Sequence, residues 1–136
     1  MFPDNPTACI SLGQTYVEIG KYEDAIVESE KAVALAGGSL DNKAKLGYVY
    51  AKSGMRDEAK TIINELEEQI NLKYVSPYQI ASIYSALNEG DLAFQWLKEA
   101  FESRDLYINF LKVDPIFDNI RSDPRFEMML KKINLN

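Results

Sequence analysis

Residues 12–16 read Leu-Gly-Gln-Thr-Tyr, residues 46–50 read Leu-Gly-Tyr-Val-Tyr, and residues 80–84 read Ile-Ala-Ser-Ile-Tyr. Each stretch begins 34 residues after the previous one, and an alanine follows each tyrosine at the same distance. A fixed period of this length is typical of a stack of one supersecondary unit. The sequence therefore predicts a repeat protein with three units, at residues 6–39, 40–73 and 74–107.

Turn residues and apolar spacing predict two helices in each unit. Gly20, Gly54 and Asn88 stand in the same slot, where a helix ends in a left-handed residue. Ser76-Pro77 is typical of a helix start, with serine as the N-cap and proline in the first turn. The predicted helices cover residues 6–19, 22–36, 41–53, 56–71, 76–87 and 90–103.

This skeleton resembles the tetratricopeptide repeat, a helix–turn–helix unit. That family keeps small residues at three slots where the two helices cross, and the first repeat has Gly13, Ala25 and Ala32 there. Larger side chains would overpack the crossing. The first repeat departs from the pattern at Ser29, which fills an aromatic slot. The resemblance implies an all-α superhelix of helix pairs.

Residues 108–136 do not repeat and are predicted to cap the last repeat's apolar face. Asp114-Pro115 and Asp123-Pro124 each place an N-cap before a proline, and the second predicts a helix near 123–133. The segment 111–126 resembles a C-terminal signature of bacterial tetratricopeptide proteins, whose repeats often follow a signalling or regulatory domain. The tail also holds a basic cluster, interpreted either as an acidic-partner contact or, preferably, as a solvated cap: Lys112, Arg121, Arg125, Lys131 and Lys132.

The N-terminus suggests that the repeat series is longer than this chain. Pro3 stands 34 residues before Gly37, and residues 3–6 read like the join between two repeats. We therefore expect a C-terminal piece of a longer protein. The alternative is a short protein with a proline-rich cap.

Composition excludes several classes of function. The chain has 136 residues, one domain's worth, and a net charge of −6, which argues against nucleic-acid binding and against anchoring on an anionic membrane. No apolar run approaches the roughly 18 residues of a membrane span. The single cysteine, Cys9, rules out an internal disulfide and suits a reducing compartment, so we expect a cytoplasmic protein.

Catalytic and cofactor chemistry has little support. Histidine is absent, so no Ser-His-Asp or Cys-His arrangement exists. Glu65 and Glu68 share a helical face, but exposed helices commonly collect glutamate. Cys9 falls at a core-facing slot, and Gly37-Gly38 lacks the spacing of a phosphate loop and is read as a turn. We predict a non-enzyme with no cofactor and no metal.

The resemblance implies a concave groove, lined by the first helix of each repeat, that holds a peptide. Tyrosines are favoured in such sites because they contribute area with little entropy to lose. Tyr48 and Tyr78 have an alternative, packing between neighbouring helices. The residues carried over to the groove are Ile10, Gln14, Val17, Asp41, Tyr48, Lys52, Tyr78, Ser82 and Ser85.

One specialisation of the family is absent. The carboxylate clamp for chaperone tails needs lysine, asparagine and arginine at five positions, which here hold Ile10, Gln14, Lys45, Val75 and Gln79. We therefore predict no chaperone-tail binding. The predicted function is a non-catalytic module that binds a protein partner or peptide through the groove. The alternative is self-assembly, including a homodimer, through exposed repeat ends.

Overall fold

The structure is a computed structural model that describes residues 5–134, so the prediction for Pro3 lies outside the described residues. Within that range every regular element is a helix, and the predicted all-α fold class is confirmed. The helices are α1 (Pro6–Glu18), α2 (Tyr22–Leu35), α3 (Leu40–Lys52), α4 (Arg56–Gln69), α5 (Pro77–Ala86), α6 (Gly90–Glu102) and α7 (Pro124–Asn134), with two 3-10 helices, η1 (Leu106–Phe110) and η2 (Pro115–Ile120).

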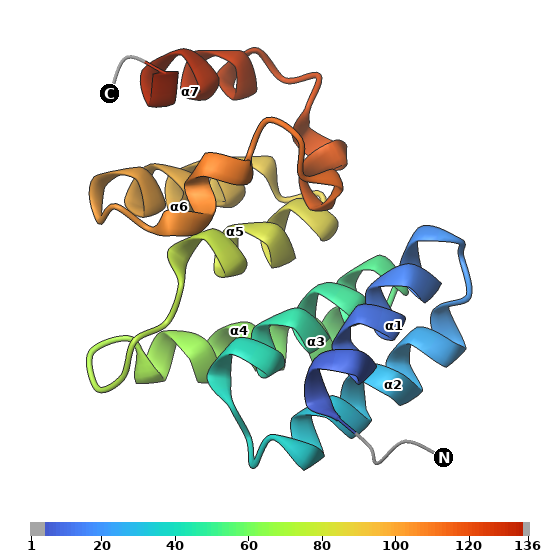
Figure 1. The fold of residues 1–136 in the computed structure, drawn as a ribbon. Helices are drawn as coiled ribbons and strands as arrows, with labels where there is room; N and C mark the ends of the chain where they lie inside the picture. Colours follow the sequence, from blue (N-terminus) through green and yellow to red (C-terminus); the bar gives the residue numbers. More distant parts are fainter. Residues whose placement is uncertain (1–4, 135–136) are drawn as a thin grey trace. The chain divides into compact units, whose positions relative to one another are not determined.

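The chain divides between Val75 and Ser76 into two compact units, each described by itself. Unit 1 holds two helix pairs, α1–α2 and α3–α4, in blue to green in Figure 1. Unit 2 holds the third pair, α5–α6, followed by η1, η2 and α7. The prediction of a single domain stays a prediction.

The turns within the helix pairs form as the sequence predicts. Gly20, Gly54 and Asn88 have φ angles of 79°, 82° and 62°, the left-handed conformation that closes a helix. At the start of α5, the Ser76 side chain accepts a hydrogen bond from Gln79 N. Gly37, also left-handed, belongs to the turn that ends α2, as predicted.

In unit 1, α1 and α2 approach closely because small residues face each other. Ala25 and Ala32 have no exposed surface, and a methyl group added at Gly13 would lie 2.5 Å from Ser29 Oγ. Ser29 is buried in the slot that the family fills with an aromatic residue, and its hydroxyl has no hydrogen-bond partner. The two helices therefore cross at close range, with small side chains in place of large apolar ones between them.

In unit 2 the non-repeating tail completes the core of the helix pair. Phe94 and Leu97 of α6 share one apolar cluster with Leu111, Phe117 and Phe126 of the tail. Asp114 caps η2 and Asp123 accepts a hydrogen bond from Arg125 N at the start of α7. The tail covers the last helix pair in the way that the cap prediction requires.

Candidate functional site

On α1, two of the three candidate groove residues are core residues. Ile10 and Val17 are buried, and Ile10 packs in a small cluster with Cys9 and Ala32. The burial of Cys9 agrees with the structural interpretation of this thiol. Gln14 is half-buried and is the accessible polar candidate on this helix.

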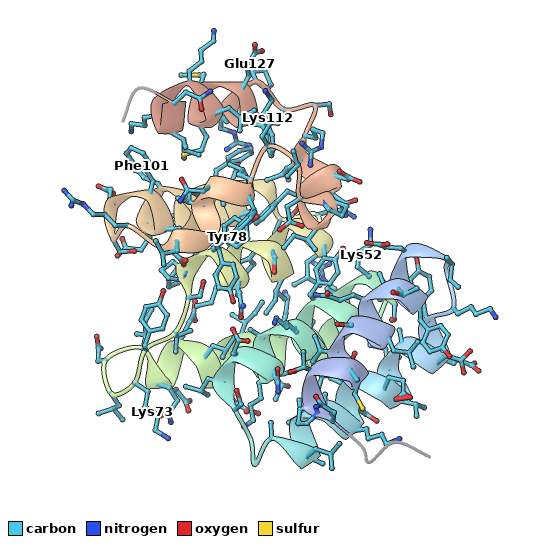
Figure 2. All side chains as sticks on the ribbon, in the orientation of Figure 1. Lys52, Lys73, Tyr78, Phe101, Lys112 and Glu127 are labelled. Atoms are coloured by element: carbon cyan, nitrogen blue, oxygen red, sulfur yellow. The ribbon has the colours of Figure 1, made fainter. Side chains whose placement is uncertain are left out.

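On α3, which packs against α1, the candidates divide in the same way. Tyr48 is buried, Asp41 is exposed and Lys52 is half-buried in the last turn, where Figure 2 labels it. The Asp41 carboxylate forms an ion pair of 3.2 Å with Lys45, one turn later. Unit 1 thus presents Gln14, Asp41 and Lys52 as accessible polar side chains on two contacting helices.

On α5 all three candidates are buried: Tyr78 is 1%, Ser82 3% and Ser85 0% exposed. The Tyr78 ring, labelled in Figure 2, stacks on Tyr107 with centroids 5.8 Å apart and meets the edge of Phe117 at 4.9 Å. The Tyr78 ring therefore packs against the tail of its own unit.

The Tyr78 hydroxyl donates to Asp114 Oδ2 at 2.7 Å. Burial, and then this hydrogen bond, raise the pKa of Tyr78 well above the ordinary value of a tyrosine, since both disfavour the phenolate. Asn119 Nδ2 similarly donates to the Ser85 carbonyl at 3.2 Å. Two α5 candidates thus have hydrogen-bond partners in the tail.

A buried acid that the sequence analysis did not single out anchors the same region. Asp105, only 4% exposed, accepts hydrogen bonds from Ser76 Oγ at 2.6 Å and Tyr78 N at 3.2 Å, while its other oxygen accepts from Tyr107 N at 3.1 Å. The only sequence signal for Asp105 was its place near the end of the third repeat, because aspartate is a favoured N-cap for a helix that follows. Its partners are 27 and 29 residues away and could not be read from spacing.

Two arginines of the basic tail cluster form hydrogen bonds and ion pairs within unit 2. Arg121 donates to the backbone carbonyls of Lys112 and Asp114, both at 2.7 Å. Arg125 pairs with Asp91 at 2.8 Å and Asp123 at 2.9 Å, and its guanidinium lies 4.6 Å from the Phe94 ring centroid. These contacts favour the capping interpretation over an acidic-partner site.

Among the residues that the structure describes, each unit has a cleft of its own. In unit 2, a polar cleft of about 680 Å³ separates the α5–α6 turn from the start of α7, and the Arg125 ion pairs lie in its wall. In unit 1, a cleft of about 310 Å³ lies where α2, α3 and α4 meet. The residues of the second cleft are Val33, Lys43, Leu46, Tyr50, Glu58, Thr61, Ile62 and Glu65.

Among residues 5–134, no cluster of cysteine and acidic residues is arranged to hold a metal ion. No helix there is both long and apolar enough to cross a bilayer.

Comparison with known proteins gives one family match. Residues 6–38, which form α1 and α2, match the family model described as tetratricopeptide repeat. No curated protein and no solved structure matches the chain. Tetratricopeptide repeats generally mediate protein–protein interaction and are generally not catalytic.

Proposed function

We propose that this chain is a non-catalytic module that binds a peptide segment of a partner protein on the face formed by α1 and α3. The observation that carries the proposal is the set of three accessible polar side chains, Gln14, Asp41 and Lys52, on two first helices that pack together. The family match on α1 and α2 supports protein binding as the general role.

The chemistry of this face suits a peptide backbone. The Gln14 amide can donate and accept at once, as an extended peptide requires. Lys52 adds three donors for carbonyl or carboxylate oxygens. The α1 helix carries one acidic residue, Glu18, and no basic residue, and α3 carries one acid and three lysines, so the two helices together do not repel an acidic segment.

Site-specific photocrosslinking tests the face directly. A photoreactive amino acid replaces Gln14 or Lys52, and the control replaces Val27, which is 63% exposed on α2. The same partner should crosslink from Gln14 and Lys52 and not from Val27. Crosslinks from Val27 alone would place the partner elsewhere and reject the proposed face.

The self-assembly alternative has one specific observation in its favour. Leu12 of α1 and Ile19, the C-cap residue of that helix, are 40% and 61% exposed, whereas Leu46, the repeat equivalent of Leu12, is 7% exposed. Large exposed apolar side chains on one helix are typical of interaction surfaces. Sedimentation velocity would reveal a dimer that is lost in the variant Leu12→Lys/Ile19→Lys and kept in Val27→Lys. A monomer at all concentrations would reject this alternative.

A further inference from the structure

The cleft in unit 1 is distinct from the face proposed above, because none of the three residues that carry that face, Gln14, Asp41 and Lys52, lines it. Its apolar lining comes from three helices: Val33 of α2, Leu46 of α3 and Ile62 of α4. Leu46 and Ile62 are 7% and 6% exposed, so the lining is part of the folded core. A volume of about 310 Å³ is close to the roughly 300 Å³ at which pockets begin to hold small ligands. The cleft can take one large apolar side chain.

The wall of the cleft is acidic. Glu58 is exposed, and Glu65 keeps 43% of its side chain exposed although Lys43 Nζ lies 2.9 Å from its Oε2. Lys43 is the only basic residue in the lining, and this ion pair occupies it. The cleft therefore offers carboxylate oxygens without a free cation of its own.

A third carboxylate lies at the Tyr50 end of the cleft. The Tyr50 hydroxyl donates to Glu30 of α2. The pKa of Tyr50 is raised, and the largest cause is burial of its hydroxyl. The hydrogen bond to Glu30 and the negative charges of Glu30 and Glu58 raise this pKa further. Glu30 and Glu58 thus act on one hydroxyl, and this end of the cleft is electronegative.

The helices α2 and α4, which flank the cleft, each carry a net negative charge. Helix α2 has four acidic residues and one lysine, and α4 has five acidic and two basic residues. Complementary charge selects partners and speeds their encounter. A ligand that carries positive charge beside its apolar group is therefore complementary to this rim.

We propose that this cleft is a second docking site, and that its occupant is a basic peptide segment with one leucine, isoleucine or phenylalanine as anchor. The anchor side chain enters between Val33, Leu46 and Ile62. Arginines on either side of the anchor meet Glu58 and Glu65, because a guanidinium fits a carboxylate with two parallel hydrogen bonds.

Fluorescence anisotropy of the purified chain with three labelled peptides tests the chemistry. The first peptide has a central leucine with two arginines on each side. The second replaces the leucine by serine, and the third replaces the arginines by glutamates. The first should bind at least tenfold more tightly than either of the others. Equal binding of the serine peptide would overturn the proposal, because attraction would then be charge alone.

Matched variants test the location. Glu58→Lys/Glu65→Lys should weaken binding of the first peptide at least tenfold. The control Glu99→Lys/Glu127→Lys changes the net charge equally at two exposed residues outside the cleft and outside the α1–α3 face, and should keep most of the affinity. Circular dichroism confirms that both variants fold. An equal loss in both variants would overturn the proposal.

Methyl NMR spectra of the wild-type chain give a readout that needs no variant. Addition of the first peptide should shift the methyl signals of Val33, Leu46 and Ile62. Shifts at Ile10 and Val17 instead would assign the peptide to the α1–α3 face. That result would overturn the second site and leave the proposed function standing.

Discussion

The Tyr78 hydroxyl and the Asp114 carboxylate, 36 residues apart, form a hydrogen bond of 2.7 Å. Asp114 also accepts the backbone N–H of Ile116 through its other oxygen. One carboxylate therefore joins the first turn of α5 to the start of η2. The relationship explains why a tyrosine in a groove slot of the repeat is buried.

Replacing Tyr78 by phenylalanine should destabilise unit 2 by about 1.5–3 kcal/mol, the range for a hydrogen bond to a charged group. The ring contacts with Tyr107 and Phe117 remain in this variant, so the loss reports the hydroxyl. Urea unfolding followed by circular dichroism measures the change. Tyr107→Phe serves as the control, and an equal loss there would contradict the special role of Tyr78.

Alkaline pH should destabilise the chain partly through Tyr78. Its folded-state pKa is raised, so its contribution is complete below the unfolded value of about 10 and is lost as pH rises above it. Between pH 10 and 11 the slope from one such group approaches about 1.4 kcal/mol per pH unit. Tyr78→Phe should flatten the measured pH dependence of unfolding. An unchanged slope would show that other tyrosines, Tyr50 included, determine it.

Asp105→Ala should cost at least about 3 kcal/mol, because it leaves three donors without their acceptor: Ser76 Oγ, Tyr78 N and Tyr107 N. Asp105→Asn keeps one acceptor oxygen and should cost less. Amide hydrogen exchange at Tyr78 and Tyr107 gives the local readout, with faster exchange in both variants. Unchanged protection at both amides would contradict the anchoring role.

Gly13→Ala and Ser29→Ala should be strongly non-additive. Alone, Gly13→Ala places a methyl group against Ser29 Oγ and should destabilise by about 1–3 kcal/mol. Ser29→Ala removes a buried hydroxyl without a partner and should be neutral or stabilising by about 1 kcal/mol.

In the Ser29→Ala background, Gly13→Ala should become neutral or stabilising, because alanine exceeds glycine in helix propensity by about 1 kcal/mol. Thermal unfolding of the four proteins completes the cycle. Additive effects would show that Ser29 is not the group that limits space at Gly13.

The sequence was sufficient for the parts of the fold that repeat. Local signals specified the helix ends: Gly20, Gly54 and Asn88 all adopt the left-handed conformation that their slot predicts. The predicted helices agree with α1 to α6 within two residues at each end. Periodicity succeeded there because each unit's packing depends on neighbours at fixed spacing.

The candidate site was harder to predict, because contacts with the non-repeating tail decide it. The repeat pattern placed Ser85 and Tyr78 in a groove. No periodic signal reveals that Asn119 forms a hydrogen bond with the Ser85 carbonyl, or Asp114 with the Tyr78 hydroxyl. The cleft of unit 1 was also missed, since its lining residues come from three helices. The predicted bacterial regulatory context and the longer parent protein stay predictions.

The uneven charge of unit 1 has a consequence for how partners arrive. Helices α2 and α4 carry the acidic excess, while α1 and α3 together have more lysines than acids. The unit therefore has an electric dipole moment, and its field extends over about one Debye length, roughly 8 Å at physiological ionic strength. A protein of complementary charge would be oriented by this field before it makes contact with the unit. Its association rate constant would therefore fall as the salt concentration rises.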